Sequence, residues 1–446
     1  MGRISIDDIG EWPGSTEGTA VEPMVAVDPN NPQHVLAVYH ARAILAGGYA
    51  ASRDGGKTWV SGGLPGFSAP TGGPFDATWD LAAAFGPDGS TYVTAGAGDR
   101  FPSDHAAIQI ARSPDGGLTW LQPITIVEEN TCVRLDKPWV AVDTFPTSSH
   151  FGRVYVAWTE FRTLQPIVAG GIVYSHIVMS HSDDRGATWS ASVSVSDPAN
   201  VIDFGAIPVV HPNGDVSVIG GVQTVDPGAS SFDTAMLSHN SHDGGETFDL
   251  PVPIDMFLGI SPEGLREAGY HTAAIDRTTG ELFVAWPDAR SRLGDANDIV
   301  VSRSTDGGAT WSRPGVVTPG EAGRTYFLPS LASDDGYVHL SYLTRTEGSD
   351  LVDTRYVVSE DGGATFGGEL VLATESDLKY SPRQGFCPSE PLPTLLFPES
   401  DCGFLGDYTG IAAARGHVYV TWPHASKPTG SETTPNQSIW GAAIDR

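Results

Sequence analysis

Polar and aromatic residues recur where short apolar segments of the chain begin, and their types could do acid–base chemistry on a sugar. Paired carboxylates can act as a general acid and as a base or nucleophile. Aromatic rings can stack on the apolar face of a sugar, while charged groups bond its hydroxyls. The catalytic candidates are Asp136, Asp407 and Glu22, and the substrate-binding candidates are Asp80, Lys137, Trp139, His271, Arg324, Tyr326, Tyr408 and Arg266. Trp79, Asp203 and Tyr270 occupy similar positions.

Asp136 and Asp407 are the preferred pair for proton transfer, because each lies beside an aromatic residue and a backbone shaped by Pro or Gly. Carboxylates crowded on one rim repel each other. We therefore expect at least one of them to have a raised pKa or to pair with Lys137 or Arg324. Two other interpretations stay open. The same residues could recognise hydroxyl groups without catalysis, or could bond neighbouring strands and buried water.

Six copies of one eight-residue pattern set the spacing of the chain. Its skeleton is S-x-D-x-G-x-T-[WF], and successive copies start between 55 and 69 residues apart. The copies are SRDGGKTW (52–59), SPDGGLTW (113–120), SDDRGATW (182–189), SHDGGETF (241–248), STDGGATW (304–311) and SEDGGATF (359–366). The Asp can accept hydrogen bonds from backbone N–H groups of its own turn, and the Gly two residues later supplies positive φ. Segments in which apolar and polar residues alternate lie on both sides of the copies, so the pattern predicts a hairpin turn between two strands.

This pattern resembles the Asp-box of sialidases and related bacterial-neuraminidase-repeat proteins, and the match spans nearly the whole chain. The resemblance implies a β-propeller in which each box joins the third and fourth strands of a blade, on the face away from the substrate funnel. It also implies a structural role for the box aspartates. The box is specific for the fold but not for an activity, because propellers with different functions carry it.

Each repeat also contains an inner pair of apolar segments separated by a turn, as in KPWVAVD and GRVYVAWTEF. One repeat is therefore four antiparallel strands, which is one propeller blade. The six boxes account for blades over about 20–374, and about 403–446 adds three strands without a box. The N-terminal segment near 3–7 could supply the missing outer strand. We expect a single all-β propeller domain over 1–446 with seven blades; six blades and a terminal appendage is the alternative.

The resemblance does not predict a strict exo-sialidase. Sialidases hold the substrate carboxylate with three arginines, and the first of these stands in an F/Y-R-I-P motif on the first blade. The matching position here reads VEPM, which places Glu22 where the arginine belongs. A carboxylate there would repel sialic acid, and Arg266, Arg324 and Arg383 could form only a partial clamp. A glycosidase-like activity stays the favoured kind of enzyme.

The composition limits the partners and the location. The 446 residues include 53 Gly and 33 Pro, which favours short strands and turns, and 54 acidic against 25 basic residues give a net charge of −29. An acidic protein is not expected to bind nucleic acid or an anionic membrane surface. The chain has no apolar run of about 18 residues that could span a membrane. We expect a monomeric, acidic, extracellular protein, although MGRISIDDIG has no signal-peptide pattern.

The cysteines and one acidic loop suggest further sites. Cys387 and Cys402 bracket a Pro-rich loop that a disulfide would stabilise, and a pairing with Cys132 stays open. We expect that no cofactor is required. The segment GDANDI offers Asp295 and Asp298 as weak candidate Ca²⁺ ligands, because oxygen-rich loops bind calcium; a solvated polar turn is the alternative.

Two classes of function stay open. The first is a secreted enzyme acting on glycans, either a glycoside hydrolase or a polysaccharide lyase, with its site in the central funnel. The second is a non-catalytic extracellular propeller that binds carbohydrate or protein. Two carboxylates about 5 Å or about 6.5–9.5 Å apart in an open funnel would favour the enzyme. Aromatic residues without such a pair would favour the binding protein.

Overall fold

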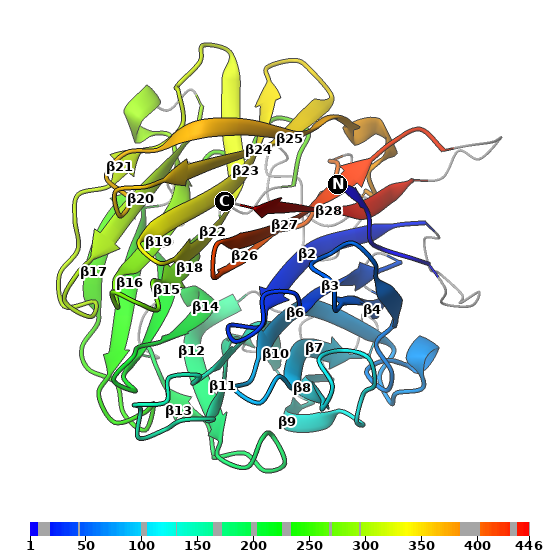
Figure 1. Ribbon diagram of the computed structural model, residues 1–446, viewed down its shortest axis with the longest axis vertical. Coiled ribbons are helices and arrows are strands. Elements are labelled where there is room, and N and C mark those ends of the chain that lie inside the picture. Colours follow the sequence, from blue (N-terminus) through cyan, green and yellow to red (C-terminus); the bar gives the residue numbers. More distant parts are fainter. Residues whose placement is uncertain are drawn as a thin grey trace.

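The computed structural model of the protein describes residues 1–7, 18–42, 45–99, 105–130, 132–163, 172–197, 203–224, 233–266, 270–293, 296–383, 402–428 and 435–445. In these ranges 28 strands form seven four-stranded antiparallel sheets. The sheets follow one another around a ring in sequence order (Figure 1). The prediction of a seven-bladed β-propeller is confirmed, and the six-bladed alternative is wrong.

Each sheet is described from its innermost to its outermost strand. The first three sheets contain β2 (Ala20–Val27), β3 (Val35–Ala41), β4 (Ala46–Ser52) and β5 (Val60–Gly63); β6 (Ala77–Phe85), β7 (Thr91–Gly98), β8 (Ala106–Ser113) and β9 (Ile124–Glu129); and β10 (Val133–Val142), β11 (Val154–Thr163), β12 (Ile172–Ser182) and β13 (Val193–Ser194). The next three contain β14 (Asp203–Val210), β15 (Val216–Thr224), β16 (Asp233–Ser241) and β17 (Val252–Phe257); β18 (Thr272–Ile275), β19 (Leu282–Asp288), β20 (Asp298–Ser304) and β21 (Gly315–Val316); and β22 (Arg324–Asp334), β23 (Tyr337–Thr346), β24 (Leu351–Ser359) and β25 (Gly367–Asp377). The seventh contains β26 (Gly410–Ala414), β27 (His417–Ala425), β28 (Gln437–Asp445) and β1 (Gly2–Arg3). The short 3₁₀ helices η1 (Ala69–Thr71), η2 (Arg290–Arg292) and η3 (Leu378–Tyr380) lie in connections, and no helix of the described ranges is long and apolar enough to cross a membrane.

The first and last strands of the chain close the ring. β1 pairs antiparallel with the middle of β28, so the outer strand of the seventh sheet comes from the other end of the chain. The ladder covers Gly2–Arg3, slightly before the expected segment near 3–7. The backbone N–H groups of Ile4 and Ser5 then both donate to the Ile439 carbonyl. Innermost strands contact their neighbours all the way around, and β26 contacts β2. No innermost strand is therefore left without a neighbouring blade.

The core lies between neighbouring sheets. Trp158, Trp286 and Trp422 come from the same place in three sheets, on the second strands β11, β19 and β27, and each is buried. Their side chains fill the space between one blade and the next with apolar surface, which stabilises the ring in the way that it stabilises any protein interior.

Each eight-residue repeat, called the octapeptide turn below, joins the third and fourth strands of its sheet, as predicted. In the turn at 304–311, the Asp306 carboxylate accepts bonds from the Ser304 hydroxyl at 2.9 Å, the Thr310 backbone N–H at 2.9 Å and the Thr310 hydroxyl at 2.6 Å. The corresponding bonds are present in the other five turns. The bond from the Thr310 hydroxyl is the main cause of a lowered Asp306 pKa.

The octapeptide turns lie on the face of the disc where the innermost strands end, because successive antiparallel strands alternate in direction. The innermost strands begin on the opposite face, which is called the entrance face below. The candidate residues that open these strands therefore lie away from the octapeptide turns, as the resemblance implied.

Substitutions in the turn at 304–311 test its structural role. Asp306→Ala removes the acceptor for three bonds at an exposed site and should lower the free energy of unfolding by about 1 kcal/mol. Trp311→Ala should lower it by about 2–3 kcal/mol, because this half-buried ring packs between sheets. Thr305→Ala, at the exposed variable position of the same turn, is the control and should change it by less than about 0.5 kcal/mol. Urea unfolding measures all three, and equal curves for Asp306→Ala and Thr305→Ala would contradict the structural role.

Candidate functional site

A shared backbone irregularity places side chains of several innermost strands near the channel axis. In β2, β6, β10, β14 and β22, two residues of the strand lie opposite one residue of its partner, which is a β-bulge. The first residue of each bulge has a left-handed backbone. These residues are Glu22 (φ 53°), Asp80 (φ 51°), Lys137 (φ 50°), Gly205 (φ 69°) and Leu328 (φ 47°). A non-glycine residue held in this conformation costs about 1–3 kcal/mol, so surrounding contacts must stabilise it.

The Lys137 ammonium group is the centre of an ion cluster at the first three bulges. Its Nζ lies 2.5 Å from Asp80 Oδ1, 2.8 Å from Asp407 Oδ2 and 3.6 Å from Glu22 Oε1. The side chains of all four residues are less than a tenth exposed. Burial opposes the lysine charge, but attraction by Asp407, Asp80 and Glu22 outweighs burial and raises the pKa of Lys137 well above its usual value.

Aromatic rings surround the same ammonium group. Lys137 Nζ lies 5.0 Å from the centre of the Tyr270 ring and 5.3 Å from that of Tyr408, both within the range of a cation–π contact. Trp139 packs edge-on against Tyr408 with the ring centres 5.7 Å apart. The predicted residues Lys137, Trp139 and Tyr408 therefore lie together, with Tyr270 beside them.

Glu22 holds its neighbours in place and has both oxygens engaged. Its Oε1 accepts the Asp407 backbone N–H at 3.0 Å, and its Oε2 lies 2.8 Å from His40 Nε2. Burial raises the Glu22 pKa, but Lys137 and His40 outweigh burial and hold the pKa well below its usual range. This geometry favours a positioning role for Glu22, and its catalytic role stays a prediction. His40, on the second strand β3, was not among the sequence candidates; its Nε2 also lies 2.6 Å from the Asp80 backbone nitrogen.

Asp407 lies on the connection that leads into β26 and contacts two cations. Its Oδ2 accepts bonds from Lys137 and, at 3.1 Å, from Arg266 Nη2. Its Oδ1 is buried and has no hydrogen-bond partner in the described part of the chain. The preceding Gly406 has φ 120°, and a Cβ there would lie 2.8 Å from the Glu22 backbone nitrogen. Only glycine therefore allows this connection to approach β2 so closely.

Asp136 differs from the other carboxyl groups of the cluster. Its side chain is 17% exposed, and Arg134 Nη2 lies 4.0 Å from its Oδ1. Burial and the neighbouring Asp80 carboxylate raise its pKa to about 7, against the opposing effects of Arg134 and Lys137. The expectation that one crowded carboxyl has a raised pKa therefore fits Asp136. At neutral pH this residue can both hold and release a proton.

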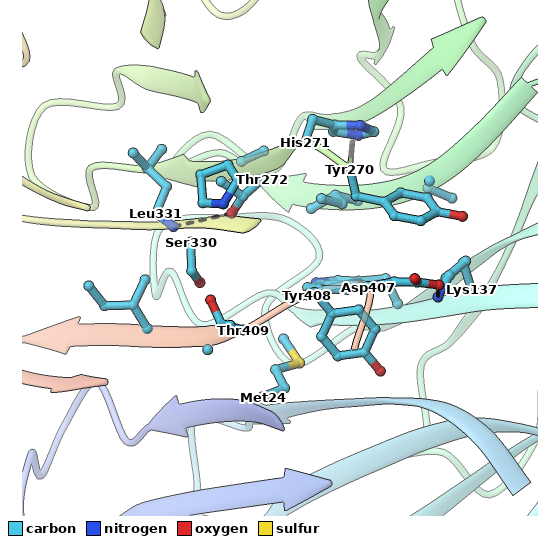
Figure 2. Close-up of a pocket in the computed structure, with 18 residues that line it drawn as sticks. Met24, Lys137, Tyr270, His271, Thr272, Ser330, Leu331, Asp407, Tyr408 and Thr409 are labelled. Carbon is cyan, nitrogen blue, oxygen red and sulfur yellow. Dashed lines mark hydrogen bonds and ion pairs between the residues drawn. The ribbon is translucent and has the colours of Figure 1, made fainter. Parts of the chain in front are cut away.

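A cavity of about 120 Å³ lies along the channel axis next to the ion cluster. Figure 2 shows Lys137, Asp407, Tyr408 and Tyr270 at one end of the group of lining residues, with Met24, Ser330, Thr409 and Leu331 farther along. His271 also lines the cavity, and its Nε2 donates to the Ile219 carbonyl at 3.2 Å. Burial lowers the His271 pKa to about 4, so the ring is neutral at pH 7.

Arg324 and Tyr326 lie outside this cluster, and their role in substrate binding stays a prediction. Arg324 Nε lies 3.0 Å from Glu321 Oε2, and the buried Tyr326 packs edge-on against Tyr342 between sheets. The physical reason is the position of the bulge. In β22 it falls at Leu328, four residues after the start of the strand, so Leu328 occupies the place that Glu22, Asp80 and Lys137 occupy elsewhere.

The remaining predicted features lie outside the ion cluster. Asp298 accepts bonds from the Ser291 hydroxyl at 2.7 Å and the Thr318 hydroxyl at 3.0 Å, and Asp295 lies outside the described residues. The calcium site therefore stays a prediction. Cys402 is disulfide-bonded, and Cys387 lies outside the described residues.

Three ligand atoms could in principle hold a metal ion inside the cluster. Glu22, His40 and Asp80 each offer one, all within 4.8 Å of one another. The Lys137 ammonium group already supplies positive charge to two of these three residues. Lys137 therefore already balances the negative charge of these carboxylates, so the three ligand atoms do not fit an additional divalent cation beside the lysine.

Comparisons with known proteins agree on the fold. No protein-family model matches the chain, and no curated protein sequence matches it. Among solved structures, a Hadza microbial sialidase is 15% identical over 92% of this chain and 73% of its own, with a TM-score of 0.51. An ulvan lyase is 14% identical over 96% of this chain and 94% of its own, with a TM-score of 0.53. An α-L-arabinofuranosidase from Fusarium graminearum is 13% identical over 77% and 92%, with a TM-score of 0.52. The chain shares their propeller fold.

Asp136→Asn tests the raised pKa without any substrate. A carboxyl whose pKa is higher in the folded than in the unfolded protein destabilises the fold as the pH rises from about 4 to about 7. The asparagine has no such penalty. Relative to the unchanged protein, the variant should therefore gain about 2–4 kcal/mol of stability between pH 4 and pH 8. Urea unfolding at both pH values measures this gain. Glu360→Gln, at an exposed position, is the control. A gain in stability for Asp136→Asn that is no larger than the gain for this control would contradict the raised pKa of Asp136.

Lys137→Met tests the ion cluster. It leaves the buried carboxylates without their central cation and should lower the free energy of unfolding by about 3–5 kcal/mol at pH 8. The loss should shrink below about pH 4.5, which is the pKa of Glu22 in the unfolded chain. The ionised Glu22 carboxylate stabilises the folded protein in full only above that pH, and this stabilisation depends on Lys137. Lys57→Met, on an exposed octapeptide turn, is the control. A loss independent of pH would mean that packing, not charge, is responsible.

Proposed function

We propose that the protein is a glycoside hydrolase whose active site lies at the entrance-face mouth of the central cavity. The observation that carries this proposal is the Asp136 carboxyl, which is partly exposed and has its pKa raised to about 7 by burial and by the neighbouring Asp80. Such a group is protonated at slightly acidic pH and can give its proton to a glycosidic oxygen.

Asp407 supplies the second carboxylate. Lys137 and Arg266 hold its Oδ2, which leaves Oδ1 for a ligand. In the proposed step the Asp136 proton passes to the glycosidic oxygen while the bond from that oxygen to the anomeric carbon breaks. A water oxygen bonds to the anomeric carbon, and the proton of that water passes to Asp407. Exchange of one proton with solvent then restores both carboxyl groups.

The surroundings of these carboxyl groups support a sugar as substrate. Trp139 and Tyr270 are half-buried at the cavity and offer ring surface, which suits the apolar face of a sugar. The solved structures of similar fold are, by their names, a sialidase, an ulvan lyase and an arabinofuranosidase. We propose that glycan is the ligand class here too.

An extracellular, monomeric protein is part of this proposal. The disulfide at Cys402 supports it, because disulfides persist in oxidising compartments. The net charge of −29 supports a monomer, since self-repulsion opposes association.

A non-catalytic glycan-binding propeller is the second candidate. It is favoured by the burial of the ion cluster, because Asp80, Lys137 and Asp407 are 5%, 8% and 1% exposed. Carboxylates so far from solvent can serve to hold four blades together, with recognition left to the residues at the mouth.

Turnover by Asp136→Asn separates the two candidates. The unchanged protein should release reducing ends from at least one member of a panel of neutral and acidic polysaccharides, at a rate that falls as the pH rises through about 7. Asp136→Asn should lose about 100-fold or more in kcat, because asparagine cannot donate the proton, while binding is kept.

The matched control is Asp203→Asn. Burial also raises the Asp203 pKa, to about 6, but its side chain bonds Ser196 away from the cavity, so its turnover should be unchanged. Equal rates for Asp136→Asn and the unchanged protein would overturn the assignment of the acid. Binding of a polysaccharide without cleavage of any panel member would favour the second candidate.

A further inference from the structure

The cations at the cavity are already occupied by the protein's own carboxylates. Lys137, which lines the cavity, directs its ammonium group to Asp80, Asp407 and Glu22. The nearby Arg266 donates to Asp407 and stacks on the Phe404 ring, 4.4 Å from its centre. A ligand carboxylate would have to displace these ion pairs, so the described lining offers it no ready partner.

One hydrogen-bond acceptor at the same cavity lacks a donor. Asp407 Oδ1 is buried without a partner in the described part of the chain. The buried His271 ring, in contrast, contacts the backbone of both Ile219 and Gly205. A buried acceptor left without a donor costs about 1–3 kcal/mol, so a ligand with hydroxyl groups gains by supplying one. Figure 2 shows the hydroxyls of Ser330 and Thr409 turned toward one another farther along the cavity.

The size of the cavity limits what enters it. Its volume of about 120 Å³ is below the ~300–1,000 Å³ of pockets that enclose whole small molecules. It is suited to a side arm of a sugar while the ring stays at the mouth beside Tyr270.

We infer that this cavity is a subsite for the uncharged, hydroxyl-bearing arm of a sugar, which donates a hydrogen bond to one lone pair of Asp407 Oδ1 and leaves the other to the attacking water, and that uronic acids are excluded from it. This inference rests on the proposed function, and it narrows the substrate class to neutral glycans whose sugars carry a hydroxymethyl group. The lining supports it, since beyond the ion cluster it includes the hydroxyls of Ser330 and Thr409 together with the apolar Met24 and Leu331.

Matched methyl glycosides test the subsite by binding alone. Glucose, xylose and glucuronate differ at a single ring carbon, which carries a hydroxymethyl group, no substituent and a carboxylate, respectively. Galactose, arabinose in its pyranose form and galacturonate form a second series of the same kind. Calorimetry or ligand-observed NMR on the full chain should give Kd values about tenfold or more lower for the hydroxymethyl sugar of at least one series. Equal affinity for the pentose, tighter binding of the uronate, or no binding of any of the six by a protein that cleaves polysaccharide would overturn the subsite.

Two variants locate the effect. Ser330→Leu fills the cavity and should remove the advantage of the hydroxymethyl sugar while leaving pentose binding within about threefold. Asp407→Asn should keep its oxygen on Lys137 and Arg266 and turn an amide donor toward the ligand, which should improve uronate binding relative to the neutral sugar by about fivefold or more. Unchanged selectivity in a folded form of either variant contradicts the inference. If the affinities follow the expected order but the protein cleaves no polysaccharide of the panel, the proposed hydrolysis is wrong and the subsite is retained.

Discussion

The centre of the propeller depends on one buried ammonium group. Lys137 comes from the third blade and contacts carboxylates of the first, second and seventh. Removing an ammonium group from water costs several kcal/mol, and a single carboxylate rarely compensates that cost. Three carboxylates at one lysine do so, but only if all four blades are held at fixed positions around the axis. The same contacts keep three strained left-handed residues in place and determine which atoms are left for a ligand.

The fold could be predicted because its signal is local and repeated. Six octapeptide turns with the same Ser, Asp, Gly and Thr contacts mark the third and fourth strands of six blades, and each turn can be recognised without knowing any long-range contact. The seventh blade needed only the observation that three strands remain and that the N-terminal segment can complete them. The closing strand was expected near 3–7, whereas the ladder covers Gly2–Arg3. Backbone hydrogen bonds to β28 continue from this ladder to Ile4 and Ser5, and nothing in the sequence marks where the ladder ends.

The structure brings only part of the predicted residues together, and the position of the bulges decides which ones. Glu22, Asp80 and Lys137 stand out as polar residues in otherwise apolar segments, so the sequence locates them. Their common position is set by a bulge, and the distance from strand start to bulge differs between blades. Choosing Arg324 and Tyr326 by their place at the start of β22 therefore missed the axis, where Leu328 stands. His40 was missed because it reaches the cluster from a second strand.

A usable signal for the bulges was nevertheless present. Pro23, Pro138 and Pro329 each follow a left-handed bulge residue. A proline donates no backbone hydrogen bond and is tolerated in a sheet mainly at edges and bulges. In these three strands the proline marks its neighbour on the N-terminal side as the bulge residue, whereas Pro208 of β14 lies in a regular part of its ladder.

Because the two ends of the chain close the ring, the contacts of the propeller form in a definite order during synthesis of the chain. Contacts between successive blades join segments that are close in sequence, so these contacts can form while the chain is still being synthesised. The bond from Lys137 to Asp407 spans 270 residues, and the bond from Asp407 to Glu22 spans 385. Neither can form before the last blade has left the ribosome. A nascent chain with six finished blades would therefore have an extensive core but no assembled mouth, so ligand binding would report the completed molecule and not its earlier intermediates.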